Sequence, residues 1–279
     1  MKKIGIFILM FLISVLSFSE TFTEKETRIK NGKTEIYGIR YIPDKKGKMP
    51  LVILSHELGG THKNVERYAK ALAEEGIVAY IFDFPGGSVD GRGSQSTGRK
   101  STEMSVMTEV SDVEKIIEES KKWDYVDQNK IVLIGGSQGG VVSAFTASRN
   151  IDKVAGLVLM YPAFVMEDDI HNFAPTRDKI PQEFTMRGWI KVGAVYFKDA
   201  YDIDFMKEAA KYNKPVLILH GTLDPHVPVI KSEKLNASYP NSKLVLIEGA
   251  EHSFRDNDEH FNKAMAEINK YLKENKLDK

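Results

Sequence analysis

A glycine-rich turn between two apolar runs limits most strongly what this chain can fold into. Residues 131–148 read IVLIGGSQGGVVSAFTAS. The run from Ile131 to Ile134 is typical of a short buried strand, and the small and apolar residues from Val141 onward have helical spacing. Ser137 lies in the turn between them, in a G-x-S-x-G pattern. The sequence therefore predicts a strand, a sharp turn that carries a serine, and a helix.

Ser137 has two interpretations in this turn. In the first, the serine is the N-cap of the following helix. In the second, it is a nucleophile whose hydroxyl is lifted above the sheet edge, where side chains in place of Gly135 and Gly139 would collide with the turn. The helix N-terminus would then supply N–H groups where negative charge develops. The strand before the turn and the helix after it favour the nucleophile.

The rest of the chain alternates strand-like and helical segments. Continuous apolar runs occupy 51–55, 77–82, 131–134, 154–160, 215–219 and 243–247, and helical patterns occupy 64–75, 108–122 and 257–276. Asn31-Gly32 between two alternating runs predicts an opening antiparallel hairpin. Together these segments predict an α/β fold with a mostly parallel sheet flanked by helices. Residues 20–279 are expected to form one domain, with the aromatic-rich stretch 164–212 as an inserted cap.

A serine nucleophile needs a base and an acid, and ligands of open α/β sheets bind beyond the carboxyl ends of the strands. The last two predicted strands are followed by Asp224 and His252. Ser137, Asp224 and His252 occur in the chain order of the α/β-hydrolase triad. We expect His252 to take the serine proton and Asp224 to orient the histidine ring. His226 is the alternative base, but it lies too close to Asp224 in the sequence to come from a separate loop.

Two backbone N–H donors are expected to stabilise the oxyanion. One is the N–H of Gln138, directly after the nucleophile, and the other is assigned to Leu58, in the loop 56–60 that follows an early strand. No spacing of histidines typical of a metal site occurs in the sequence. No metal ion or cofactor is therefore predicted.

These motifs together resemble the α/β-hydrolase superfamily. The similarity is closest to its cinnamoyl or feruloyl esterase-like branch and to the related monoacylglycerol-lipase and serine-aminopeptidase-like hydrolases, and it runs from about Tyr37 to the C-terminus. It is carried by residues 56–60, 83–88, 135–140, 220–224 and 249–252. The resemblance implies a serine hydrolase of small-molecule carboxylic esters, with short acyl or hydroxycinnamoyl groups. It also implies that Tyr196 meets a phenolic hydroxyl of the substrate, and Trp189 is expected to stack on an aryl ring.

Two positions depart from the family pattern. Glu57 stands where the first loop usually has glycine, which predicts either a strained loop or a carboxylate near the site. Gly87 stands where the family usually has histidine. An exported peptidase, an acyltransferase or a lysophospholipase would use the same triad, so the fold alone does not separate these activities. A silent binding scaffold is a further alternative, which only Glu57 supports.

The first 19 residues have the pattern of a secretory signal peptide. Lys2 and Lys3 precede an apolar run that ends at Leu16, and small residues precede a cleavage point at Glu20. The protein is therefore expected to be secreted or periplasmic, without stable membrane insertion after cleavage; an uncleaved anchor is the alternative. The chain has 39 basic and 39 acidic residues, and this balanced net charge does not indicate a nucleic-acid partner. It has no cysteine, which excludes thiolate catalysis. The sequence makes no prediction of the oligomeric state.

Overall fold

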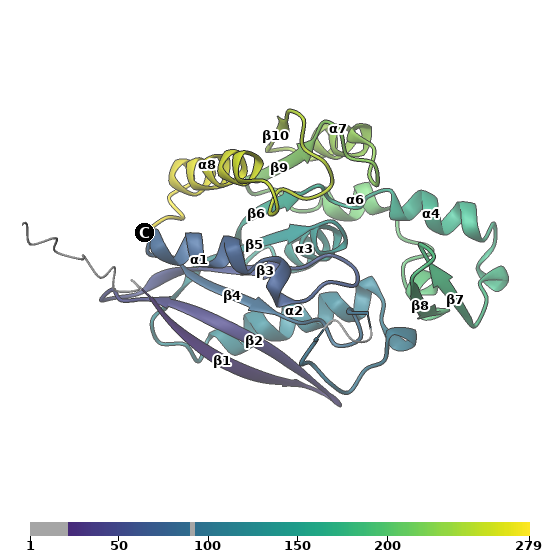
Figure 1. Ribbon diagram of the computed structural model, residues 1–279, viewed down its shortest axis with the longest axis horizontal. Helices are drawn as coiled ribbons and strands as arrows, with labels where there is room; N and C mark the ends of the chain where they lie inside the picture. Colours follow the sequence, from purple (N-terminus) through teal and green to yellow (C-terminus); the bar gives the residue numbers. More distant parts are fainter. Residues whose placement is uncertain (1–21, 90–92) are drawn as a thin grey trace, which may run out of the picture.

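An eight-stranded sheet forms the centre of the protein (Figure 1). The computed structural model describes residues 22–89 and 93–279, so the predicted signal peptide lies outside the described residues. The strand order is β1-β2-β4-β3-β5-β6-β9-β10. The strand bounds are β1 Phe22–Asn31, β2 Thr34–Pro43, β3 Met49–Ser55, β4 Val78–Phe82, β5 Val126–Gly136, β6 Val154–Met160, β9 Val216–Gly221 and β10 Ser242–Ile247.

The sheet is antiparallel at one edge and parallel elsewhere. β1 and β2 form the predicted hairpin, in which Asn31 pairs with Thr34 and Gly32 turns the chain with a φ of +60°. A left-handed residue is needed in such a tight turn, and glycine adopts that conformation without a steric penalty. β2 is antiparallel to β4, and all later neighbours are parallel. The prediction of a mostly parallel sheet is therefore confirmed.

Helices cover both faces of the sheet. Alternate residues of β3 face opposite ways: Leu51 and Ile53 pack with α2 and α3, whereas Val52 and Leu54 pack with α1 and α8. Burial on both faces explains why the central strands are continuously apolar in sequence. The helix bounds are α1 Glu66–Glu74, α2 Val106–Ser120, α3 Gln138–Arg149, α7 Val229–Ser238 and α8 Asp258–Glu274.

The chain between β6 and β9 forms small elements of its own. Figure 1 shows α4, β7 and β8 grouped at one end of the molecule. The rings of Phe173, Phe184 and Phe197 pack together there, with centroids 4.6–5.4 Å apart. Several of the aromatic residues that mark this segment in the sequence therefore pack against one another. The bounds are α4 Met166–Phe173, β7 Glu183–Met186, β8 Ile190–Gly193, α5 Val195–Lys198 and α6 Phe205–Ala209.

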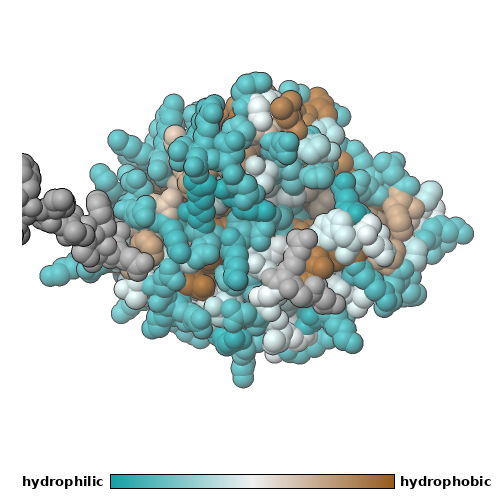
Figure 2. Space-filling model, viewed as in Figure 1, coloured by the Kyte–Doolittle hydropathy of each residue, from teal (hydrophilic) through white to brown (hydrophobic). Residues whose placement is uncertain are grey.

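The outer surface is mostly polar. In the view of Figure 2 hydrophilic residues dominate, and hydrophobic residues gather in small patches, one of them over α7. No helix within residues 22–89 and 93–279 is long and apolar enough to cross a membrane.

Candidate active site

Ser137 lies in the turn that joins β5 to α3. Its φ is +51° and its ψ is −119°, values that residues other than glycine rarely adopt. A Cβ atom at Gly135 would overlap the carbonyl oxygen of Gly139, and a Cβ at Gly139 would overlap the carbonyl oxygen of Ser55. Both glycines are therefore required by the close approach of α3 to β3 and β5, as the sequence predicts.

Ser137, His252 and Asp224 form a chain of two hydrogen bonds, with His252 in the middle. The Nε2 atom of His252 is 2.9 Å from the Oγ of Ser137, and its Nδ1 is 2.7 Å from the Oδ2 of Asp224. The acid comes from the loop after β9 and the histidine from the loop after β10. The structure therefore brings together three residues that are up to 115 positions apart in the sequence.

The Asp224 carboxylate accepts hydrogen bonds at both oxygens. Its Oδ1 accepts from the backbone N–H groups of His226 and Val227, at 2.8 and 2.9 Å. The Nε2 of the buried His220 lies 3.2 Å from Oδ2, so a second histidine contacts the acid. Burial opposes ionisation of this group, but the hydrogen bonds from His220, His252 and Val227 outweigh burial and lower the pKa of Asp224 well below its usual range. Asp224 is therefore an anion at neutral pH.

His226, the alternative base, lies beside His252 and not in the hydrogen-bonded chain with Ser137. Its ring packs edge-on against the ring of His252, with centroids 5.1 Å apart, and it lines the cavity beside Ser137. The nitrogen that bonds the Oγ of Ser137 belongs to His252. The geometry thus favours His252 as the base.

The two predicted oxyanion donors belong to the residue after Ser137 and to a residue that lines its cavity. Gln138 is the first residue of α3, so its backbone N–H has no acceptor within the helix. Leu58 lies in the loop after β3 and lines the same cavity as Ser137. His56 holds that loop: its Nε2 accepts from the Phe84 N–H at 3.1 Å, which leaves Nδ1 to donate to the carbonyl oxygen of Glu57 at 2.7 Å. Burial lowers the pKa of His56, so its ring is neutral and structural.

Glu57 places a carboxylate beside the site. Its Oε1 accepts from the Nη1 of Arg255 at 2.5 Å and from the Nδ2 of Asn64 at 2.7 Å. Its backbone is outside the left-handed region, so the alternative of a strained loop is wrong. Burial opposes ionisation of Glu57, but the nearby Arg255 guanidinium lowers the pKa of this carboxyl. Of the two outcomes expected for Glu57, the structure therefore has the carboxylate near the site, as one half of an ion pair.

A cavity of about 410 Å³ opens at Ser137. Trp189, at the turn between β7 and β8, is 46% exposed and lines the cavity. A Cβ at Gly59 would overlap the Trp189 ring, so the indole packs directly on the loop after β3. Arg187, in the same turn, also lines the cavity and bonds Asp169 at 2.8 Å. The remaining lining residues are Glu57, Leu58, Ala163, His226, Val227 and His252.

Tyr196 does not have the predicted role. Its side chain is 1% exposed, and its hydroxyl donates to the Oε1 of Gln138 at 2.6 Å. It is also absent from the lining of the cavity at Ser137. The prediction that Tyr196 meets a phenolic hydroxyl of the substrate is therefore wrong, because the tyrosine is buried and its hydroxyl is already bonded to the residue after the nucleophile.

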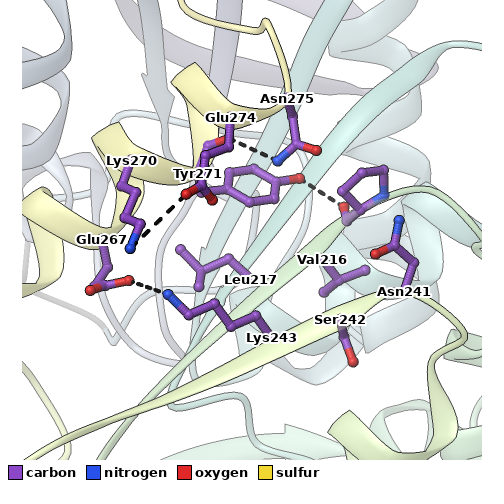
Figure 3. Close-up of a pocket in the computed structure, with 11 residues that line it drawn as sticks. Val216, Leu217, Asn241, Ser242, Lys243, Glu267, Lys270, Tyr271, Glu274 and Asn275 are labelled. Carbon is purple, nitrogen blue, oxygen red and sulfur yellow. Dashed lines mark hydrogen bonds and ion pairs between the residues drawn. The ribbon is translucent and has the colours of Figure 1, made fainter.

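A second hollow lies at the opposite edge of the sheet, where β9 and β10 begin (Figure 3). Its volume is about 200 Å³. Its polar side chains pair with protein atoms: Lys243 with Glu267 at 2.8 Å, and the Tyr271 hydroxyl with the carbonyl oxygen of Pro215 at 2.7 Å. Because ligands of parallel sheets bind at the carboxyl ends of strands, the cavity at Ser137 is the candidate active site.

The fold and the strand–serine–helix turn define an α/β-hydrolase. More particularly, the chain belongs to the dienelactone hydrolase family, whose sequence profile matches residues 36–277. Est1E from Butyrivibrio proteoclasticus, solved with ferulic acid bound, is similar with 25% identity and a TM-score of 0.77, over 87% of this chain and 97% of that one. The family resemblance expected from the sequence is thus confirmed.

Two further proteins resemble this chain with lower sequence identity than Est1E, one of them over less of the chain. A monoacylglycerol lipase of Paleococcus ferrophilus has a similar fold, with a TM-score of 0.61 and 21% identity over 84% of this chain and 97% of that one. The quorum-quenching protein AidA of Acinetobacter baumannii is 24% identical over 123 residues, which is 44% of this chain. The matched segment spans 38% of that relative's length.

Sequence reasoning did not identify two polar residues that contact the site. Arg255 follows His252 by three positions and pairs with Glu57, and no local pattern indicates this contact. Glu109 is buried in α2 and bonds the side chain of Gln138 at 2.8 Å. A signal for Glu109 exists, because it lies at helical spacing from the inward-facing Val106 and Val113. An acid on the apolar face of a helix requires a partner.

Proposed function

We propose that this protein is a secreted serine hydrolase of carboxylic esters, with Ser137, His252 and Asp224 as its catalytic triad. The observation that carries the proposal is the 2.9 Å contact between the Oγ of Ser137 and the Nε2 of His252, at a serine held in a strained turn. Serine needs an adjacent base to become an effective nucleophile, and this contact supplies one. The family membership and the similarity to Est1E support a hydrolytic reaction.

The proposed reaction has two halves. His252 takes the proton of Ser137 as the serine oxygen attacks the ester carbonyl, and then gives that proton to the leaving alcohol. Asp224 remains ionised, holds the ring tautomer and stabilises the imidazolium. The N–H groups of Gln138 and Leu58 bind the oxyanion of each tetrahedral intermediate. Water then repeats these steps on the acyl-enzyme and releases the acid.

We propose that the acyl group is short or of hydroxycinnamoyl type. The cavity at Ser137 is limited to about 410 Å³ and has apolar walls at Leu58, Ala163 and Val227, with the Trp189 indole beside them. An aryl ring can stack on that indole in an offset or edge geometry. Est1E, which binds ferulic acid, supports this choice.

We also propose that the chain is exported and that mature protein begins near Glu20. Support comes from the basic, apolar and small-residue order of the first 19 positions. N-terminal sequencing of protein recovered outside the cytoplasm tests this; an intact Met1 would favour the membrane-anchor alternative.

A substrate panel tests the activity. Esters of one alcohol with acetyl, hydroxycinnamoyl, long acyl and aminoacyl groups should be ranked by kcat/KM, with acetyl and hydroxycinnamoyl first. Ser137→Ala should lower kcat by about a millionfold, because only residual binding of the oxyanion remains. A preference for aminoacyl esters would favour the peptidase, and one for long acyl chains would favour the lysophospholipase. Turnover by Ser137→Ala above a few per cent of the wild type would refute the triad.

A further inference from the structure

Both ends of the Gln138 side-chain amide are held by buried partners. The amide nitrogen donates to the Oε2 of Glu109 in α2 at 2.8 Å. The amide oxygen accepts from the hydroxyl of Tyr196 in α5 at 2.6 Å. All three side chains are buried. The residue that follows Ser137 is thus connected to α2 on one side and to the inserted segment on the other.

Glu109 is an unusual partner, because it is a carboxyl group 1% exposed to solvent. No ion pair to it is found within residues 22–89 and 93–279. The charged groups that face it are Asp112 on its own helix and Arg99 from the preceding loop, and these two pair with each other at 2.5 Å. Gln138 and Tyr196 face it from α3 and α5 and are neutral. Burial raises the pKa of Glu109 to about 8, so the carboxyl is protonated at neutral pH.

We propose that Glu109 and Tyr196 are positioning residues, which clamp the side chain of Gln138 and thereby fix its backbone N–H toward the oxyanion. This inference rests on the proposed function, because the oxyanion donor is part of that function. Glu109 and Tyr196 are assigned no contact with the substrate or with Ser137. The clamp also makes the oxyanion hole dependent on the inserted segment, since α5 supplies the tyrosine.

The physical reason is that Gln138 has little freedom to satisfy its amide otherwise. A buried amide that loses one partner carries a desolvation cost and turns toward a new partner or admits water. The peptide between Ser137 and Gln138 is held on one side through the Ser137 carbonyl, which accepts from the N–H groups of Gly140 and Ala163 at 3.0 Å. On the other side it is held through the Cα of Gln138, which carries the clamped side chain. A side chain that moves to a new partner displaces this Cα and thereby shifts the N–H that the transition state uses. Loss of an entire oxyanion donor lowers kcat by 100- to 1000-fold, so misalignment should cost about tenfold.

The ionisation of Glu109 adds a second consequence. Above pH 8 a negative charge would lie next to the amide of Gln138, where it opposes the developing oxyanion. The protonated form is the favourable one, so kcat should decline as the pH rises through about 8. Glu109→Gln keeps an acceptor for the Gln138 amide and cannot ionise, so it should lack this decline.

The test compares Tyr196→Phe, Glu109→Leu and Glu109→Gln with the wild type on an acetyl and a hydroxycinnamoyl ester. Tyr196→Phe should lower kcat about tenfold on both esters with little change in KM. Glu109→Leu should also lower kcat, and Glu109→Gln should restore most of that loss at pH 7. The inhibition constant of phenylboronic acid, which forms a tetrahedral adduct, should rise by a factor similar to the loss in kcat.

Tyr201→Phe is the matched control, because its hydroxyl donates to the carbonyl oxygen of Ala174, away from Gln138. Unchanged kcat and unchanged boronic-acid inhibition in Tyr196→Phe would overturn the proposal. A loss confined to the phenolic ester would also overturn it, since that result would indicate a substrate contact. Melting temperatures separate a loss of fold from a loss of alignment. An inactive Ser137→Ala beside a fully active Tyr196→Phe would refute the clamp alone, whereas an active Ser137→Ala would refute the proposed function.

Discussion

Glu109→Gln should make the protein more stable at alkaline pH, although it alters a group that bonds the candidate site. Glu109 is fully buried in α2, and its pKa rises from 4.5 to about 8 on folding. Between these two values the unfolded chain releases the proton and the folded chain keeps it. Stability therefore falls as the pH rises through this window, and a glutamine in this position is free of that loss.

The size of the effect follows from the same two values. Each unit of pKa difference corresponds to about 1.4 kcal/mol, so the wild type should lose about 5 kcal/mol relative to Glu109→Gln over the whole titration. The difference between the two proteins should be constant below pH 4.5 and should level off above pH 8. Any packing difference between acid and amide is the same at every pH and cancels from the slope.

Urea unfolding at pH 5, 6, 7 and 8 measures this difference directly. The free energies of unfolding of the wild type and Glu109→Gln should diverge steadily with pH. Glu118→Gln is the control on the same helix, because Glu118 is exposed and its ion pair is with Lys121 on the surface. Parallel curves for Glu109→Gln and the wild type would show that Glu109 ionises near its ordinary pKa, and would refute the assignment of a neutral buried carboxyl.

Three further variants test other contacts. Asp224→Asn should lower kcat by about 10⁴-fold and His252→Ala by more, because the acid orients the base without carrying the proton; a silent Asp224→Asn would mean that the acid is misassigned. Trp189→Ala should lower kcat/KM about fivefold for an aryl acyl ester and little for an acetyl ester, the size of one aromatic contact; equal losses would contradict stacking. Arg255→Ala should lower the free energy of unfolding by about 2 kcal/mol, because it leaves the Glu57 carboxylate without its cation, and urea unfolding that shows no loss would refute this role.

The fold and the hydrogen-bonded Ser137, His252 and Asp224 could be predicted because local pattern and topology determine them. Buried parallel strands are apolar along their whole length, and their carboxyl ends meet at one edge, so the loops after β9 and β10 had to approach the turn after β5. The glycines beside the serine were predictable for a steric reason, which the close contacts of Gly135 and Gly139 bear out.

The contacts of Tyr196, Glu109 and Arg255 could not be predicted in the same way. Each depends on how a side chain packs between elements that are distant in sequence, and the amino-acid type does not encode this. Tyr196 meets Gln138 across 58 positions and Arg255 meets Glu57 across 198. The resemblance to an esterase cap predicts a substrate contact for Tyr196, but its side chain is buried and its hydroxyl bonds the side chain of Gln138.

Ser137 is the proposed nucleophile, and His252 is the base that activates it. Labelling with a fluorophosphonate, followed by mass spectrometry of the digested protein, tests this most directly, because the reagent leaves a stable group on an activated serine. We predict one phosphonyl group per chain, on the peptide that contains Ser137, with no label in Ser137→Ala and much slower labelling in His252→Ala. An unlabelled wild type, or a label on a different residue, would contradict the role of Ser137 as the nucleophile.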